Sequence, residues 1–371
     1  MTPGRWPTYD PSNRGQGVLV IYTGGTIGSV PCDPTDPKSP LVVVDWSEFR
    51  RRTSSLSERL ADGSPNYRYI GFNVDGCSIE PLDSCNIGPE HWIQIARIIE
   101  QNYARYTGFV VLHGTDTMVY TASALSFMLD NLAKPVILTG ALRSHLTNVR
   151  NDGLQNLLTA LILANPEHSG LPIVPEVGVF FNRYLLRGNR ARKVNASGFD
   201  AFQSPNYPPL AVAGESIVVD RRVIRSVAPH ASLRLRTNLE TNVVAISFFP
   251  GIQHSSLLAD ILRDENLRGV VLMAYGAGTV PATPSVLREI EAAVRRGVIA
   301  LAVTQCGGGQ VDLERYEAST RLLDAGVLSG VDITPEAALV KLMVLLGDKN
   351  LSLGDIRNLV RQDIAGEQTV A

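Results

Sequence analysis

The sequence lacks the features that mark nucleic-acid-binding, secreted and membrane-spanning proteins. Its formal net charge is only -2 over 371 residues, so it has no electrostatic footprint for nucleic acid or for an anionic membrane. Residues 1–7 lack the apolar core of a secretory signal, and no run of about 18 apolar residues marks a membrane span. We therefore expect a cytoplasmic protein with no nucleic-acid or membrane partner.

Cysteine is scarce as well. The chain has 4 cysteines, and no two of them are spaced as C-x-x-C. This argues against a zinc knuckle and against a redox pair, and it fits a reducing compartment. Internal repeats and low-complexity tracts are also missing from the sequence.

The length is sufficient for a large core and predicts two domains. Residues 210 to about 240 follow a proline-containing break, are charged and carry few helix signals, as an interdomain linker does. We expect an N-terminal domain over residues 1–209, a linker over residues 210–240 and a C-terminal domain over residues 241–371.

Capping residues and apolar runs predict an alternation of helices and strands. Pro89 fits the first position of a helix through Glu100, while Thr283 and Thr334 each fit the N-cap of a helix that begins with proline. Apolar strand candidates lie at Val177–Phe181, Val243–Phe248, Gly269–Ala274 and Val298–Thr304. Strands that alternate with helices imply an α/β protein with parallel sheets.

Two short polar motifs each follow an apolar strand candidate. The motif Thr23–Gly28 follows the apolar run Val18–Tyr22. The motif His113–Met118 begins at the last residue of the run Gly108–His113. Open α/β sheets bind ligands at the carboxyl ends of their strands, where glycine lets the backbone approach a ligand closely. The two motifs therefore predict a site on one edge of one sheet, furnished with hydroxyl groups and a carboxylate.

Simpler interpretations of these residues remain open at this point. Thr23–Gly28 also fits a tight turn or a phosphate-binding loop, although its spacing matches neither G-x-G-x-x-G nor G-x-x-x-x-G-K-[ST]. Thr115 and Asp116 also fit a helix N-cap pair. Lys193 stands in a basic cluster, which is usually solvated surface.

The two motifs, in this order and roughly ninety residues apart, resemble those of the bacterial type I (cytoplasmic) L-asparaginases. The resemblance covers about residues 17–365 and includes four further stretches, Asn131–Gly140, Asn151–Leu157, Arg187–Arg190 and Gly198–Phe202. It implies a two-domain asparaginase-like fold, with a larger N-terminal parallel-sheet, flavodoxin-like domain and a smaller C-terminal parallel α/β domain. It also implies L-asparagine as the substrate and assembly as a homodimer or homotetramer.

The resemblance assigns roles to the motif residues. Thr26 matches the family's nucleophilic threonine, and Thr115, Asp116 and Lys193 match the hydroxyl, carboxylate and cation that accompany it. A lysine acts as a base only when it is neutral, whereas a neighbouring aspartate favours its charged form. Lys193 is therefore either the base or an electrostatic stabiliser, with Asp116 in the second case holding the substrate's amino group.

Substrate recognition is assigned in the same way. Asp83 and Ser84 match the loop that binds the substrate α-carboxylate, and Gly25 and Gly114 bring backbone groups to the site beside Thr115 and Asp116. The following Cys85 and Asn86 depart from the usual pair, which leaves side-chain selectivity open. The family's loop tyrosine is missing from Ser29–Val44, so we assign its role to Tyr316, acting in a neighbouring subunit.

The implied reaction is hydrolysis of a side-chain amide. Thr26 attacks the amide, backbone N–H groups of the glycine loops stabilise the oxyanion, and water hydrolyses the acyl-enzyme. No metal or other cofactor is expected. Cys306 matches a cysteine of a separate regulatory asparagine site, but Arg192 and Met273 differ from the residues usual there, so regulation is expected to be weak or absent.

Three alternatives stay open. The same fold serves glutaminase-asparaginases and the amidase subunit of an archaeal tRNA-dependent amidotransferase, which normally carries an extra N-terminal domain where this chain has about seventeen residues. The third alternative is a catalytically silent sensor of asparagine or aspartate. The complete set of Thr26, Thr115, Asp116 and Lys193 argues against the sensor.

Overall fold

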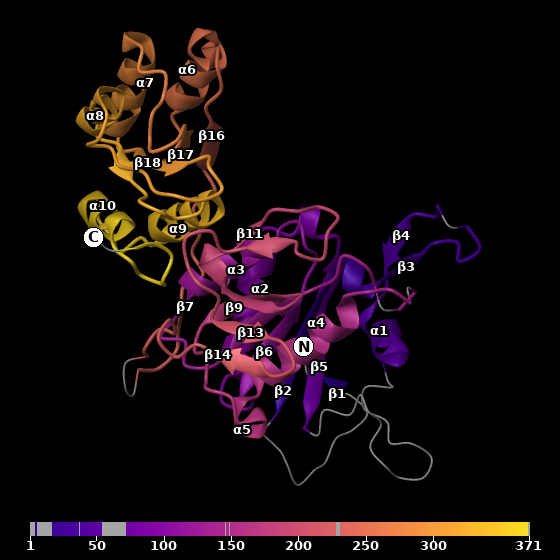
Figure 1. Cartoon of the computed structure of the whole chain (residues 1–371). Coiled ribbons are helices and arrows are strands. Elements are labelled where there is room, and N and C mark those ends of the chain that lie inside the picture. Colours follow the sequence, from indigo (N-terminus) through magenta and orange to yellow (C-terminus); the bar gives the residue numbers. More distant parts are fainter. Residues whose placement is uncertain are drawn as a thin grey trace, which may run out of the picture. The chain divides into compact units, whose positions relative to one another are not determined.

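The computed structural model describes residues 4–5, 17–36, 38–53, 72–144, 146–147, 149–227 and 231–369 (Figure 1). They form two compact units. The first unit comprises Met1–Gln203 with Pro208–Leu235, and the second comprises Ser204–Tyr207 with Arg236–Ala371.

The described part of the first unit is built on a nine-stranded sheet. In spatial order its strands are β1 (Gly4–Arg5), β5 (Val74–Leu82), β2 (Val18–Gly24), β6 (Gly108–Leu112), β8 (Val136–Thr139), β9 (Val177–Phe181), β10 (Tyr184–Arg187), β13 (Ala211–Ala213) and β14 (Ile217–Val219). The five neighbouring strands β5, β2, β6, β8 and β9 run parallel, as predicted. The strands at both ends of the order pair antiparallel, so the sheet is mixed.

The change to antiparallel pairing has a local cause. β9 and β10 are joined by Asn182 and Arg183 alone, and Asn182 has φ 56°. Asparagine tolerates this left-handed conformation, which two-residue hairpin turns require. The chain therefore turns back directly after β9 instead of crossing over through a helix.

The linker expected at residues 210–240 is not what the structure shows. β13 and β14 extend the large sheet, and β15 (Arg234–Leu235) pairs with β7 (Leu129–Asp130) of the same unit. Residues up to Leu235 thus belong to the first unit. These strands have two or three residues each, which is too short for a readable alternation of apolar and polar side chains.

Helices pack against the large sheet. α4 (Gly153–Ala164) contacts β6, β8 and β9, while α2 (Pro89–Asn102) packs against α3 (Met118–Met128) and β5. Pro89 is the first residue of α2, as predicted. The shorter helices are α1 (Trp46–Arg52) and α5 (Pro166–Ser169).

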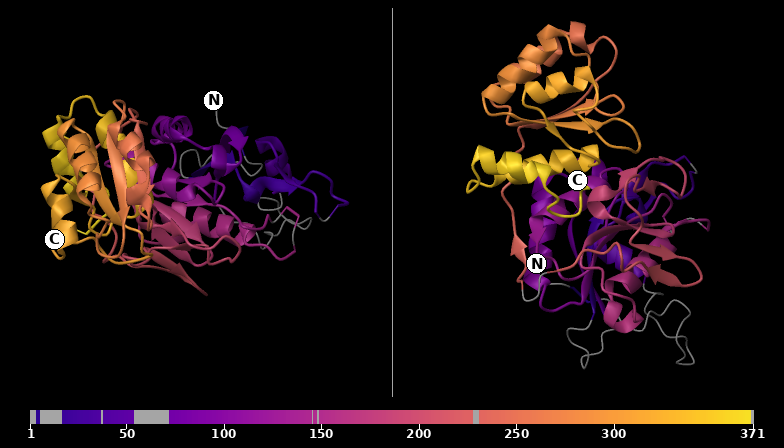
Figure 2. Two further views of the ribbon diagram at one scale, coloured as in Figure 1. Left: turned by 90° about the horizontal axis from the view of Figure 1, so that it is seen from above. Right: turned by 60° about the vertical axis from the view of Figure 1, so that its left-hand side comes forward.

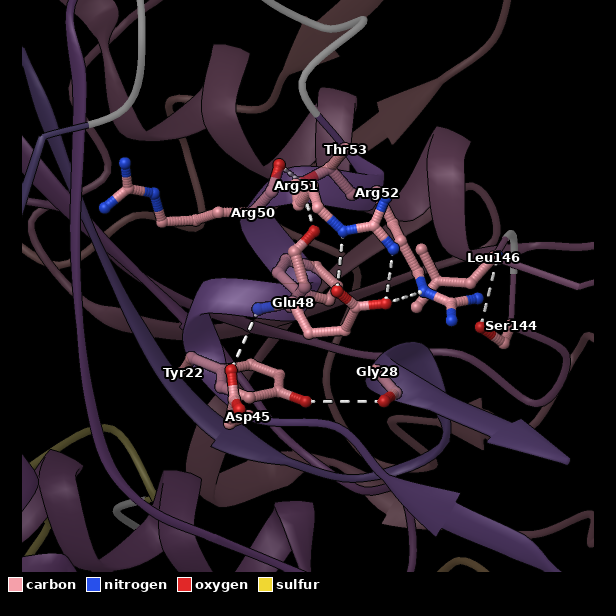
Figure 3. A network of polar contacts seen from close by, with 11 residues as sticks. Tyr22, Gly28, Asp45, Glu48, Arg50, Arg51, Arg52, Thr53, Ser144 and Leu146 are labelled. Carbon is pink, nitrogen blue, oxygen red and sulfur yellow. Dashed lines mark hydrogen bonds and ion pairs between the residues drawn. The ribbon is translucent and has the colours of Figure 1, made fainter. Parts of the chain in front are cut away.

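Helix α1 carries an aromatic face and a charged face. The ring of Phe49 stacks on that of Tyr22 with their centroids 4.9 Å apart. On the charged face, Arg51 Nε and Arg52 Nε donate to the Glu48 carboxylate at 2.7 and 2.6 Å (Figure 3). These hydrogen bonds lower the pKa of Glu48 to about 2.

The second unit is a three-layer α/β unit. Its parallel sheet has the order β16 (Val243–Ser247), β17 (Gly269–Ala274), β18 (Ile299–Thr304) and β19 (Leu328–Ser329). In Figures 1 and 2 one face carries α6 (Ser256–Arg263), α7 (Pro284–Arg295) and α8 (Glu317–Asp324), and the other carries α9 (Pro335–Gly347) and α10 (Leu353–Arg361). Thr283 and Thr334 are the N-caps of α7 and α9, as predicted.

A buried ion pair ties the C-terminal segment to α9. Lys341 Nζ lies 2.5 Å from Glu367 Oε1, and both side chains are 0% exposed. The same Nζ donates to the carbonyl oxygens of Val360 and Gln362 at 3.0 and 2.6 Å.

Among the residues that the structure describes, no helix is long and apolar enough to cross a membrane.

Candidate active site

The two glycine loops predicted from the sequence touch each other. Gly25, which follows β2, has φ 80°, and a Cβ atom added to it would lie 2.4 Å from both N and Cα of Gly114 after β6. Only glycine fits such a backbone contact. Because Gly25 and Gly114 directly precede Thr26 and Thr115, this contact brings both threonines to the same edge of the sheet.

The segment after β5 joins the same edge. A Cβ atom added to Gly114 would lie 2.5 Å from Ser84 Oγ, and Thr117 Oγ1 donates to the Ser84 carbonyl at 2.6 Å. The exposed Asp83 caps the short helix η4 (Ser84–Asn86) by accepting from Cys85 N–H at 3.2 Å. The structure thus brings Gly25, Gly114 and Ser84 together at one edge of the sheet.

Lys193 comes to this edge from a distant part of the chain. It ends β11 (Arg192–Lys193), which pairs with β12 (Phe202–Gln203), and its Nζ lies 2.8 Å from Thr115 Oγ1 and 2.5 Å from Asp116 Oδ1. Thr115 is buried, while the side chains of Lys193 and Asp116 are 17% and 64% exposed. The ammonium group is therefore neutralised on one side and still reachable from solvent.

Thr26 begins the single-turn helix η2 (Thr26–Gly28) and is half-buried. Within the described ranges, no residue forms a hydrogen bond with its hydroxyl group. A hydroxyl group that lies at a strand end and is not used by the fold is available to react.

The loop that carries Thr26 is held from several directions. Ser29 Oγ donates to the Gly25 carbonyl at 2.9 Å, and Ser144 Oγ donates to the Ile27 carbonyl at 3.2 Å. Tyr22 OH donates to the Val44 carbonyl at 2.8 Å and lies 3.5 Å from the Gly28 carbonyl (Figure 3). Burial raises the pKa of Tyr22, so its hydroxyl stays a donor. Loop geometry is therefore fixed before any ligand arrives.

A buried histidine supports the second glycine loop. His113 is 0% exposed; its Nδ1 lies 2.7 Å from the Gly114 carbonyl oxygen and its Nε2 lies 2.8 Å from Thr121 Oγ1. Thr121 Oγ1 also accepts from Trp92 Nε1–H at 3.0 Å, and an indole is only a donor. Because the Gly114 carbonyl can only accept, Nδ1–H donates to it, and Nε2 of the neutral ring accepts from the Thr121 hydroxyl. Burial lowers the pKa of His113 to about 4 and keeps the ring neutral.

Sequence reasoning missed the supporting residues Ser144, Tyr22 and His113. His113 stands inside a motif, and the lone histidine among apolar residues was the only available signal. The partners of Ser144 and Tyr22 depend on contacts that no local pattern announces. Tyr316 lies in the second unit, 46% exposed, at the N-cap of α8, so its role at the site stays a prediction.

Comparisons with known proteins place this geometry in a family. Residues 17–225 match the family model "Asparaginase, N-terminal", and residues 242–360 match "Glutaminase/Asparaginase C-terminal domain". L-asparaginase 1 of Escherichia coli K12 is 39% identical over 95% of this chain and 98% of its own length. The crystal structure of L-asparaginase I from Vibrio cholerae, 38% identical, superimposes with a TM-score of 0.80 and covers 95% of this chain and 99% of that one.

One further relative is longer. The 60 kDa lysophospholipase of Mus musculus is 40% identical over 95% of this chain, which spans 62% of that protein's length. Both family models and the relatives that match almost end to end agree with the two-unit α/β fold. The chain belongs to the asparaginase family and resembles its bacterial type I members.

Proposed function

We propose that this protein is an L-asparaginase that hydrolyses the side-chain amide of L-asparagine to L-aspartate and ammonia. The observation that carries the proposal is the convergence of Lys193 with Thr115 and Asp116 beside the Gly25–Gly114 contact. Lys193 is 77 and 78 residues away from Asp116 and Thr115 in the sequence, so only the fold brings the two segments together. Family membership supports the same reaction.

In the proposed mechanism Thr26 is the nucleophile. Its Oγ1 attacks the amide carbon, and the carbonyl oxygen takes the negative charge. Backbone N–H groups of the two glycine loops stabilise this oxyanion, and a single preorganised donor typically contributes about 3 kcal/mol. The carbon–nitrogen bond then breaks, the nitrogen leaves as ammonia with the threonine proton, and water hydrolyses the resulting ester to release aspartate and restore Thr26.

The contacts of Lys193 support a role as a stabiliser rather than as a base. Nζ donates to the Asp116 carboxylate at 2.5 Å and to the Thr115 hydroxyl, so both of its described contacts are those of a hydrogen-bond donor and not of a proton acceptor. The ammonium in turn polarises the Thr115 hydroxyl, to which it donates at 2.8 Å. Asp116 retains a free edge, since its side chain is 64% exposed, and we assign the substrate's α-ammonium group to it.

The α-carboxylate of the substrate is assigned to the segment after β5. Ser84 lies against Gly114 and is almost completely buried, so its Oγ is held in a fixed position beside the second glycine loop. Asp83 acts by capping η4, which orders the backbone N–H groups of that turn. Glutamine is the second candidate substrate because the C-terminal family model covers glutaminases as well.

Ammonia release with L-asparagine and L-glutamine, measured side by side, tests the proposal. Thr26→Ala should lose about 10³-fold or more in kcat, while Thr26→Ser should keep measurable turnover because a hydroxyl remains at the same position. Thr23 provides a matched control within the same motif. Its hydroxyl donates to the Leu112 carbonyl at 2.9 Å and is buried, so Thr23→Ala should lower stability and retain the chemistry.

Two outcomes would contradict the proposal. Turnover at the wild-type rate in Thr26→Ala would remove Thr26 from the chemistry. Stabilisation by aspartate without ammonia from either amide would instead identify a binding protein.

The proposal extends to assembly and location. We infer a homodimer or homotetramer in which Tyr316 serves a neighbouring site, and a cytoplasmic location, which the absence of disulfides among the four cysteines supports. The molar mass in solution by light scattering, together with the kinetics of Tyr316→Phe, tests the assembly. A monomer with full activity would contradict it.

A further inference from the structure

A pocket of about 380 Å³ lies in the first unit, outside the residues assigned to catalysis. Its lining is formed by Arg143, Arg150, Ser197, Gly198 and Phe199. One wall thus comes from the segment between β8 and α4, and the other from the segment between β11 and β12.

The charge of this pocket is positive. Both arginines are exposed, and the Cζ atom of Arg150 lies 5.6 Å from the ring centroid of Phe199. Stacking of this kind holds the guanidinium plane while its N–H edge stays available for bidentate hydrogen bonds. Within the described part of the chain, neither guanidinium group pairs with a carboxylate.

The two carboxylates nearest in sequence to the lining are already engaged. Asp152 accepts the backbone N–H groups of Leu142 and Arg143, the latter at 2.8 Å. Asp200 accepts from Asn182 Nδ2 at 2.5 Å. The pocket therefore offers two cations and the Ser197 hydroxyl to a ligand, and the described lining residues include no anion.

We propose that this pocket binds a small organic dianion whose acidic groups, carboxylates or a phosphate, pair with Arg143 and Arg150. Pockets that hold small molecules usually measure about 300 to 1,000 Å³, so this one suits a small metabolite better than a bare ion. Phe199 provides an apolar face for the carbon skeleton of the ligand.

The pocket is connected to both sides of the catalytic edge. Ser144, the neighbour of Arg143, donates to the Ile27 carbonyl beside Thr26 at 3.2 Å. The opposite wall continues from Lys193 through a turn closed by Val194 N–H donating to the Ala201 carbonyl at 2.8 Å. A bound dianion bridges the segments that position Thr26 and Lys193. This coupling to turnover rests on the proposed function, whereas binding itself does not.

Titration calorimetry with succinate and, separately, inorganic phosphate tests the proposal on the full chain at low salt. Arg143→Gln and Arg150→Gln should each weaken binding about tenfold, and the double variant should abolish measurable heat. Arg183→Gln is the matched control, because Arg183 is also exposed and stacks over Tyr184 with its Cζ atom 5.3 Å from the ring centroid. Its affinity should equal that of the wild type.

The outcomes distinguish a dicarboxylate ligand from a phosphate ligand, and they distinguish this proposal from the proposed catalytic function. If succinate binds more tightly, the ligand is a dicarboxylate, and if phosphate binds more tightly, it is a phosphate compound. Either result supports the proposal, provided that the arginine variants lose the binding. Binding that persists in the double variant but disappears in Lys193→Met would place the dianion in the catalytic centre and overturn the proposal. Absence of binding by both probes at about 10 mM would overturn it too. Failure to release ammonia would leave these heats unchanged and would count only against the proposed function.

Discussion

Each unit contains a lysine whose ammonium nitrogen lies 2.5 Å from a carboxylate oxygen, yet the two pairs sit in opposite surroundings. Lys341 and Glu367 are both 0% exposed. Lys193 and Asp116 are 17% and 64% exposed. The same chemical groups at the same distance therefore occur once in a closed interior and once at an open edge.

The buried pair is surrounded by groups that complete its hydrogen bonding. Lys341 also contacts two backbone carbonyls and Gln368 Oε1, and Glu367 accepts from the N–H groups of Ile364 and Ala365. Burial lowers the pKa of Lys341 and raises that of Glu367, while the contact between them favours the charged forms. Such a pair fixes structure, because every one of its partners belongs to the fold.

The open pair of Lys193 and Asp116, in contrast, retains hydrogen-bonding capacity that the protein does not use. Beyond Asp116, the described partner of Lys193 Nζ is the hydroxyl of Thr115, and the carboxylate faces solvent. The difference shows that the ion-pair distance alone does not reveal a functional lysine. What distinguishes it is the presence of donor and acceptor capacity that the protein does not use.

The largest expected effect comes from breaking the open pair on its cation side. Lys193→Met should lower kcat/KM for asparagine by about 10⁴-fold, or about 5.5 kcal/mol, because a group that acts together with others is removed. Steady-state ammonia release measures it. The free energy of unfolding in urea should change little, and a large loss of stability would show that Lys193 serves the fold as Lys341 does.

Breaking the closed pair of Lys341 and Glu367 should instead lower the free energy of unfolding. Lys341→Met should cost about 3 to 5 kcal/mol of unfolding free energy because Glu367 is left buried without its cation. Urea denaturation monitored by circular dichroism provides the measurement. The double variant Lys341→Met/Glu367→Gln should recover part of the loss, and equal stability of the single variant and the wild type would refute the assigned role.

The buried His113 predicts how the stability of the first unit depends on pH. Folding lowers the pKa of His113 from about 6.5 to about 4, so the folded protein binds this proton less tightly than the unfolded chain. Its contribution to stability is complete above pH 6.5 and is lost as the pH falls towards 4, in total about 3 kcal/mol. His113→Asn keeps a neutral donor near the Gly114 carbonyl, so subtracting its stability curve from that of the wild type isolates this loss. A flat difference between pH 4 and 6.5 would contradict it.

The smallest expected effect is that of Asp116→Asn on stability. A pair with one partner 64% exposed contributes at most about 1 kcal/mol to unfolding free energy. Glu367→Gln, the matching change in the closed pair, should cost several times more. Thermal unfolding of the two variants in parallel tests this ratio, and equal costs would remove the distinction between the pairs.

Sequence alone predicts what local chemistry determines. Pro89, Thr283 and Thr334 mark helix starts because capping acts within a few residues. β13 and β14 were predicted as linker because strands of three residues owe their pairing to partners elsewhere in the chain. The gathering of Gly25 and Gly114 was predictable because both follow long apolar strands of one parallel sheet.

The support of the site was beyond sequence reasoning. The bond from Ser144 to Ile27 joins positions 117 residues apart, and the packing of Trp92 against the Thr121 hydroxyl joins positions 29 apart. Lys193 entered the site prediction only through the resemblance, since a lysine in a basic cluster gives no sign of its own. Contacts of this kind are fixed by tertiary packing and have no local pattern.

The buried Glu367 has a practical consequence for anyone who produces this protein. Trimming by a carboxypeptidase that reached position 367, or a truncated gene that stopped before it, would strand the Lys341 ammonium group in an apolar interior. The mass of the C-terminal peptide is therefore the quality check to make before any kinetic comparison.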